Sequence, residues 1–94
     1  MNKELIVISA VWCPSCLILK KHLKRLKEEY NIDYTLLDYD FDEEDVALYE
    51  VGKKLPVIII RENESEVSRL VGEKSYEEIL DFLKGSDLVW KENY

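Results

Sequence analysis

Runs of consecutive apolar residues mark the strands that this chain is expected to form. Residues 5–8 (LIVI) and 57–60 (VIII) contain no polar position and are rich in β-branched residues, which is typical of strands covered on both faces of a sheet. Residues 33–39 predict a further strand, and the polar turn at 62–65 leads into an antiparallel edge strand at 66–71. The first two runs are therefore predicted to be the central strands of one sheet.

Apolar residues spaced by three and four positions predict two amphipathic helices. The first lies between residues 16 and 30, where lysines and an arginine fill the opposite face. Its apolar residues are Leu19, Leu23, Leu26 and Tyr30. The second runs from Ser75 to about Lys84, because Ser75 and Glu78 have the spacing of a capping box.

An acidic stretch, DYDFDEED, lies between the second and third predicted strands. It spaces Asp38, Asp40 and Asp42 like calcium ligands. An EF-hand loop that started at Asp38 would need glycine at its sixth position, where this chain has Glu43. We therefore expect Asp42 to cap a short helix at about 43–51 instead.

The predicted order of elements is β-α-β-α-β-β-α. This order indicates an α/β fold with helices on both faces of a mixed four-stranded sheet. The length of 94 residues suits one domain. We assign residues 1–85 to this domain and residues 86–94 to a C-terminal tail that is able to pack on it.

Composition and charge narrow the classes of partner. The chain is 47% hydrophobic and 35% charged, as expected for a folded domain, and its net charge of −7 repels phosphate backbones and anionic lipids. We expect neither a nucleic-acid nor a membrane partner. The apolar N-terminal run lacks a cleavage site of small residues, and no apolar segment approaches the ~20 residues that span a bilayer. We therefore expect a cytoplasmic protein, where a close cysteine pair indicates redox chemistry or metal binding.

The chain has two cysteines, Cys13 and Cys16, at the junction of the first strand and the first helix. Pro14 suits the first helical position, which places Cys13 at the N-cap, where the helix dipole stabilises a thiolate. Cys16 lies three residues further on the same face, one layer deeper. We predict that Cys13 attacks a substrate disulfide and that Cys16 resolves the mixed disulfide.

Metal binding is the alternative for the same two cysteines. A closed zinc site needs four ligands, and the only histidine, His22, lies on the lysine-rich helix far from the sulfurs, where we expect an exposed surface residue. A dimer that shares its cysteines around zinc or an iron–sulfur cluster stays open at this point.

Pro56 stands directly before the second apolar run. A trans proline inside a central strand would lose a ladder hydrogen bond, so we interpret Leu55–Pro56 as a cis bond at the start of the strand.

These features together resemble the thioredoxin superfamily from residue 4 to about residue 84. They are WCPSC after a buried strand, Leu-Pro before the third strand, a hairpin, a glycine and a final amphipathic helix. The resemblance implies that Pro56 packs beside the cysteines, that the backbone of Leu55 pairs with substrate, and that Trp12 flanks the reactive sulfur. It also implies that Pro14 and Ser15 belong to the substrate-binding surface and tune the redox potential.

The chain departs from its relatives in two respects. Thioredoxins carry a buried aspartate six residues before the first cysteine, where this chain has Val7, so proton transfer at Cys16 must use water or another group, or be slower. The Pro-Ser dipeptide is more like that of glutaredoxins. The glutathione-binding motifs of that family are nevertheless absent, because their positions hold Ala10, residues 54–56 (KLP) and residues 72–75 (GEKS).

The sequence thus predicts a thiol–disulfide oxidoreductase that acts on disulfides of proteins or small molecules and needs no metal or organic cofactor. Its electron donor would be a flavoprotein reductase, glutathione or a dedicated partner. Two alternatives stay open, namely a glutathione-dependent glutaredoxin-like reductase and a non-catalytic thioredoxin-fold adaptor or metal-cluster module.

Overall fold

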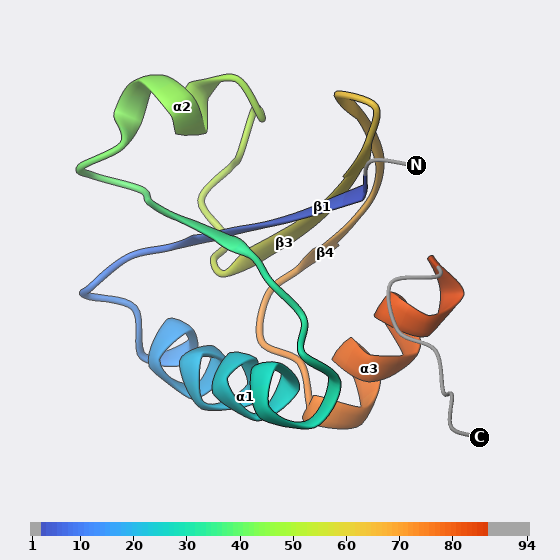
Figure 1. The fold of residues 1–94 in the computed structure, drawn as a ribbon. Coiled ribbons are helices and arrows are strands. Elements are labelled where there is room, and N and C mark those ends of the chain that lie inside the picture. Colours follow the sequence, from blue (N-terminus) through green and yellow to red (C-terminus); the bar gives the residue numbers. More distant parts are fainter. Residues whose placement is uncertain (1–2, 87–94) are drawn as a thin grey trace.

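The computed structural model describes residues 3–86, and its elements follow the predicted order (Figure 1). The strands are β1 (Lys3–Ser9), β2 (Thr35–Asp38), β3 (Val57–Glu62) and β4 (Ser65–Val71). The helices are α1 (Pro14–Tyr30), α2 (Glu43–Ala47) and α3 (Tyr76–Gly85). The predicted tail, residues 86–94, lies outside the described residues apart from Ser86.

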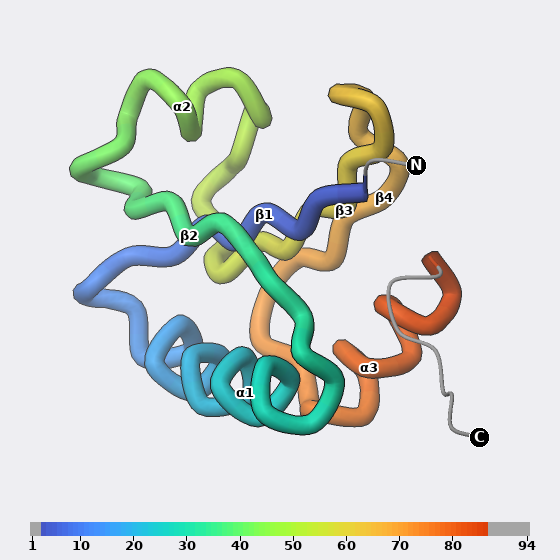
Figure 2. The backbone as a smooth tube through the Cα atoms, viewed as in Figure 1, coloured from blue at the N-terminus to red at the C-terminus, as the bar shows by residue number. Residues whose placement is uncertain are grey.

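The sheet is mixed and has the strand order β2-β1-β3-β4. β1 pairs in parallel with β2 and antiparallel with β3, and β4 closes the antiparallel hairpin (Figure 2). The two continuous apolar runs thus form the two interior strands, and residues 66–71 belong to an edge strand. Both predictions are confirmed.

Alternate residues of β1 and β3 build two separate cores on the two faces of the sheet. Leu5, Val7, Ile58 and Ile60 pack with the apolar residues of α1 and α3. Ile6, Ile8, Val57 and Ile59 pack with Val46 of α2. In Figure 1, α1 and α3 accordingly lie on one side of the sheet and α2 on the other. The predicted fold is therefore confirmed, and both strands are covered on both faces, as their continuous apolar runs require.

The ends of the two long helices follow local sequence signals. α1 begins after Cys13 with Pro14 in its first turn, and its C-cap is Asn31, which adopts the left-handed conformation with φ 55°. In α3, the Ser75 side chain accepts from the backbone N–H of Glu78, and the Glu78 carboxylate accepts from the N–H of Ser75. The predicted capping box is thus present.

The second helix is shorter than predicted. It ends at Ala47 rather than near residue 51, because the backbone tightens there into turns in which Tyr49 N–H donates to the Val46 carbonyl and Glu50 N–H to that of Ala47. Glu50 then adopts a left-handed φ of 51°. This change of direction lets Tyr49 and Val51 pack against the core on the α2 face of the sheet.

Candidate active site

The two cysteines lie together at the carboxyl end of β1. Cys13 is the N-cap of α1, and its Sγ accepts a hydrogen bond from the backbone N–H of Cys16 at 3.3 Å. Both thiols are free. Cys13 keeps 6% of its surface exposed, whereas Cys16 is completely covered. The arrangement thus places Cys13 where a substrate can reach its sulfur and Cys16 as a fully buried partner.

Burial governs the protonation of Cys16. Burial and, after it, the hydrogen bond with Cys13 raise the pKa of Cys16 to about 12. Cys16 packs with Ala10 and Cys13, and Tyr39 and Leu55 cover this cluster. The thiol of Cys16 is therefore protonated at neutral pH in the reduced protein.

The raised pKa makes the stability of the reduced protein depend on alkaline pH. Below pH 9.0, the ordinary pKa of the thiol, Cys16 is protonated in both the folded and the unfolded state. As pH rises from there toward about 12, only the unfolded state releases the proton, so stability is lost. We expect the free energy of unfolding to fall by about 1.4 kcal/mol between pH 8 and pH 10 from this group.

Urea unfolding of the reduced protein at the two pH values measures this loss, with Cys16→Ala as the control. Tyr76, whose pKa burial also raises to about 12, contributes equally to both proteins. An equal loss of stability in wild type and Cys16→Ala would contradict the assignment to Cys16.

The segment before β3 reaches the sulfur pair through Leu55. The Leu55–Pro56 bond is cis, as the sequence predicts, and Pro56 is buried. The side chain of Leu55 packs against the cysteine cluster. The carbonyl of Pro56 accepts from the backbone N–H of Gly72 at 2.8 Å, which joins this segment to the loop between β4 and α3. The side chain of Leu55 thus lies beside the sulfurs, whereas the packing of Pro56 against them and the pairing of the Leu55 backbone with substrate stay predictions.

Trp12 is exposed beside Cys13 and is held by the loop that follows β2. Its side chain is 58% exposed, yet the indole Nε1–H donates to Oδ2 of Asp40 at 2.6 Å. The ring also meets Tyr39 edge-on, with ring centroids 6.3 Å apart. Trp12 is therefore a fixed part of the surface around the cysteines rather than a core residue.

The dipeptide between the cysteines contacts a different loop. Pro14 is exposed, and the hydroxyl of Ser15 donates to Oε1 of Glu73 at 2.8 Å. Glu73 directly follows Gly72 in the loop between β4 and α3. A carboxylate thus stands on each flank of Cys13, Asp40 through Trp12 and Glu73 through Ser15.

The acidic loop after β2 is built by its own aspartates. Oδ1 of Asp38 accepts from the backbone N–H groups of Asp40 and Phe41 at 2.9 and 3.0 Å. Oδ2 of Asp42 accepts from the N–H of Asp38 at 2.7 Å, so Asp42 stands at the N-cap position of α2 without capping it by its side chain. The prediction that the Asp42 side chain caps α2 was wrong, because its carboxylate accepts a hydrogen bond from the N–H of Asp38 instead. These bonds fix the loop that presents Asp40.

Sequence reasoning missed Asp40 and Glu73 as neighbours of the cysteines. Asp40 had a usable signal, since β1 and β2 are parallel and their carboxyl ends, which lead to Trp12 and Asp40, meet at one edge of the sheet. Glu73 lacks such a signal, because its approach to Ser15 depends on how the chain turns after β4. His22 also differs from the prediction, since it is only half-exposed and its ring lies 5.8 Å from that of Tyr76.

The described residues form neither a metal site nor a membrane-spanning helix. Within residues 3–86, no three histidine, cysteine, aspartate or glutamate side chains are grouped so that they would hold a metal ion. In the same part of the chain, none of the helices has both the length and the apolar character needed to cross a bilayer.

Comparison with known proteins agrees with this geometry. The family model of thioredoxin matches residues 1–85. The structure of reduced Schistosoma mansoni thioredoxin pre-protein superposes with a TM-score of 0.79 at 26% identity, covering 89% of this chain and 78% of that one. Fasciola hepatica thioredoxin gives 0.75 at 25% identity, with 87% and 80% covered.

A mutant thioredoxin from Halobacterium salinarum NRC-1 reaches a TM-score of 0.80 at 19% identity, covering 96% of this chain and 77% of that one. At that identity the likeness concerns the fold alone. No curated protein sequence matches the chain.

Proposed function

Because this chain belongs to the thioredoxin family, we propose that it is a dithiol thiol–disulfide oxidoreductase with Cys13 as the nucleophile and Cys16 as the resolving thiol. Membership of this family supports thiol–disulfide oxidoreductase activity in general terms. The assignment of roles is carried by one observation: the Sγ of Cys13 accepts an N–H at the start of α1, whereas Cys16 is fully buried beneath it.

The two steps of the proposed reaction follow from this asymmetry. The thiolate of Cys13 attacks one sulfur of the substrate disulfide, forms a mixed disulfide and releases the other substrate sulfur as a thiolate. Cys16 then gives up its proton and attacks Sγ of Cys13, which releases the second substrate thiolate and leaves a Cys13–Cys16 disulfide. Two electrons pass from the cysteine pair to the substrate.

The side chains around the sulfurs would bind the substrate segment. Trp12 and Pro14 are exposed beside Cys13, Ser15 follows Pro14 in the first turn of α1, and Leu55 and Pro56 belong to the segment directly before β3. We propose that this surface receives disulfides of proteins or small molecules, and that the backbone of Leu55 pairs with the bound segment.

A protein reductase is the proposed electron donor, with a flavoprotein as the first candidate. A thioredoxin f2 of the same fold, 18% identical, is known in complex with ferredoxin:thioredoxin reductase, and this precedent supports a reductase as partner. We also propose a cytoplasmic location, where such reductants keep dithiols reduced.

A redox titration of the Cys13–Cys16 pair against a dithiol buffer tests the proposal, with thiol labelling followed by mass. We expect a reversible two-electron transition, and a midpoint near roughly −230 to −270 mV would identify a reductase. A midpoint near roughly −120 to −180 mV would make the protein an oxidant or isomerase. If no intramolecular disulfide formed at any potential, the exchange mechanism would be wrong.

A further inference from the structure

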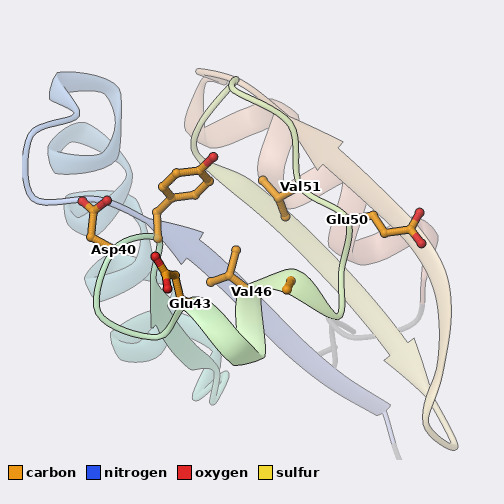
Figure 3. Close-up of a pocket in the computed structure, with 7 residues that line it drawn as sticks. Asp40, Glu43, Val46, Glu50 and Val51 are labelled. Atoms are coloured by element: carbon orange, nitrogen blue, oxygen red, sulfur yellow. The ribbon is translucent and has the colours of Figure 1, made fainter.

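A small pocket lies next to the cysteine site, between the loop after β2 and helix α2 (Figure 3). Its volume is about 270 Å³. Pockets for drug-sized ligands measure about 300–1,000 Å³, so this one suits a single side chain. Asp40, which accepts the hydrogen bond from Trp12, lines the pocket as well and therefore connects it directly to the surface beside Cys13.

The lining of the pocket divides into an apolar and an acidic part. Val46 and Val51 form the apolar part, and Figure 3 shows both side chains directed toward the middle of the pocket. Asp40 and Glu43 line the other side of the pocket. Lysine and arginine side chains combine these needs, since an apolar stem ends in a cation that hydrogen-bonds carboxylates.

We propose that the disulfides exchanged at this site are carried by basic segments, with a lysine or arginine side chain of the substrate in this pocket and its cation against Asp40 and Glu43. This inference rests on the proposed function, because it places the occupant beside the substrate disulfide at Cys13. It adds a substrate class to that function, namely a disulfide flanked by positive charge.

The opposite flank of the site has the same sign of charge. Glu73 is hydrogen-bonded to Ser15 and presents a second carboxylate close to Cys13. Lys53, Lys54 and Lys74 lie in neighbouring loop segments, but among the described residues no cation hydrogen-bonds the segment from Trp12 to Cys16. Lys20 acts on Cys16 through its charge, but the charged groups that hydrogen-bond this segment are the carboxylates of Asp40 and Glu73, which favour a cationic substrate and disfavour an anionic one.

The position of Asp40 is fixed before any substrate arrives. Its backbone N–H is held by the carboxylate of Asp38, and its own carboxylate is held by Trp12. Because the Asp40 side chain is already held in position, little of its conformational freedom is lost when it binds a cation. The same carboxylates repel glutathione disulfide, whose net charge is negative.

Two disulfide-bonded cyclic peptides that differ only in their flanking residues test the proposal, one with lysine and arginine and one with glutamate. The kcat/KM for each is measured at low ionic strength and divided by the rate of its reduction by dithiothreitol, which removes intrinsic differences in reactivity. We expect the basic peptide to be preferred about tenfold, and the preference to shrink with added salt.

The variant Asp40→Asn/Glu43→Gln isolates the charge. Asparagine still offers an oxygen to the Trp12 indole, so the surface keeps its shape while two charges are lost. We expect this variant to lose roughly two- to threefold of the preference per carboxylate. Glu28→Gln/Glu64→Gln is the matched control, since Glu28 is exposed near the far end of α1 and Glu64 is exposed in the turn between β3 and β4. It should keep the wild-type preference.

Each outcome is decisive. Equal normalised rates for the two peptides, or the same preference in both double variants, would overturn the charge proposal while leaving the exchange activity in place. Failure of the wild type to reduce either peptide would overturn the exchange function and the inference with it.

Discussion

Replacing Cys13 by serine is expected to lower disulfide reduction by about a thousandfold or more, because a serine hydroxyl is a weak nucleophile at neutral pH. Cys16→Ser should behave differently. It keeps the attacking sulfur but lacks the resolving one, so the substrate should remain attached to Cys13 as a mixed disulfide. Turnover assays combined with intact-protein mass measure both effects, the second as a gain of one substrate mass.

The two serine variants act as controls for each other, since both remove one thiol from the same cluster. Urea unfolding checks that both remain folded. Retained turnover in Cys13→Ser, or a covalent adduct on Cys16 in that variant, would contradict the assignment of roles.

Resolution of the mixed disulfide is expected to accelerate steeply with pH, by about a hundredfold between pH 7 and pH 9. The reason is the burial of Cys16, the largest cause of its raised pKa in the reduced protein. When Cys13 is tied up in a mixed disulfide, its hydrogen bond and charge no longer act on Cys16, but burial still keeps the pKa of Cys16 above 9.0. The thiolate fraction then rises about tenfold per pH unit over this range.

Rapid mixing of the reduced protein with an excess of a chromogenic disulfide separates the two steps. The first equivalent of coloured thiol reports attack by Cys13, and the second reports resolution. Cys16→Ser should release only the first equivalent of coloured thiol, and this result would identify the first phase as the attack by Cys13. A resolution rate that levels off below pH 8 would contradict the expectation, because it would reveal a proton acceptor close to Cys16.

Val7 explains why such an acceptor is not expected at the position where the relatives carry a carboxylate. Its side chain is completely buried in the core that packs beneath α1 and α3. A carboxylate at this position would lie in a low-dielectric environment, and this burial would raise its pKa. The chain has a valine there, so the proton of Cys16 must leave by another route, such as water.

The sequence predicted the fold and the placement of the two cysteines at the start of α1 well because both depend on local patterns. The apolar runs at residues 5–8 and 57–60 placed β1 and β3 in the sheet interior, and Pro14 placed Cys13 at the start of α1. Such signals depend on near neighbours in the sequence and on burial, which a single chain displays directly.

The parts that sequence reasoning missed depend on contacts between distant segments. The carboxylate of Asp42 was predicted to cap α2, but it accepts a hydrogen bond from the backbone N–H of Asp38 instead. The bond between Ser15 and Glu73 joins residues 58 positions apart. No local pattern specifies such a contact, because it follows from the direction that the chain takes after Gly72.

The cysteines follow an interior strand, whereas the neighbouring carboxylates lie on surface loops, and this difference affects which substitutions the protein can accept. Cys13 follows β1, an interior strand with a covered core on each face, whereas Asp40 and Glu73 belong to surface loops that contact the motif through single side-chain hydrogen bonds. Substitutions in these loops alter the charge that a partner meets without disturbing the sulfurs. Evolution or engineering can therefore redirect the choice of partner while the exchange chemistry is inherited intact.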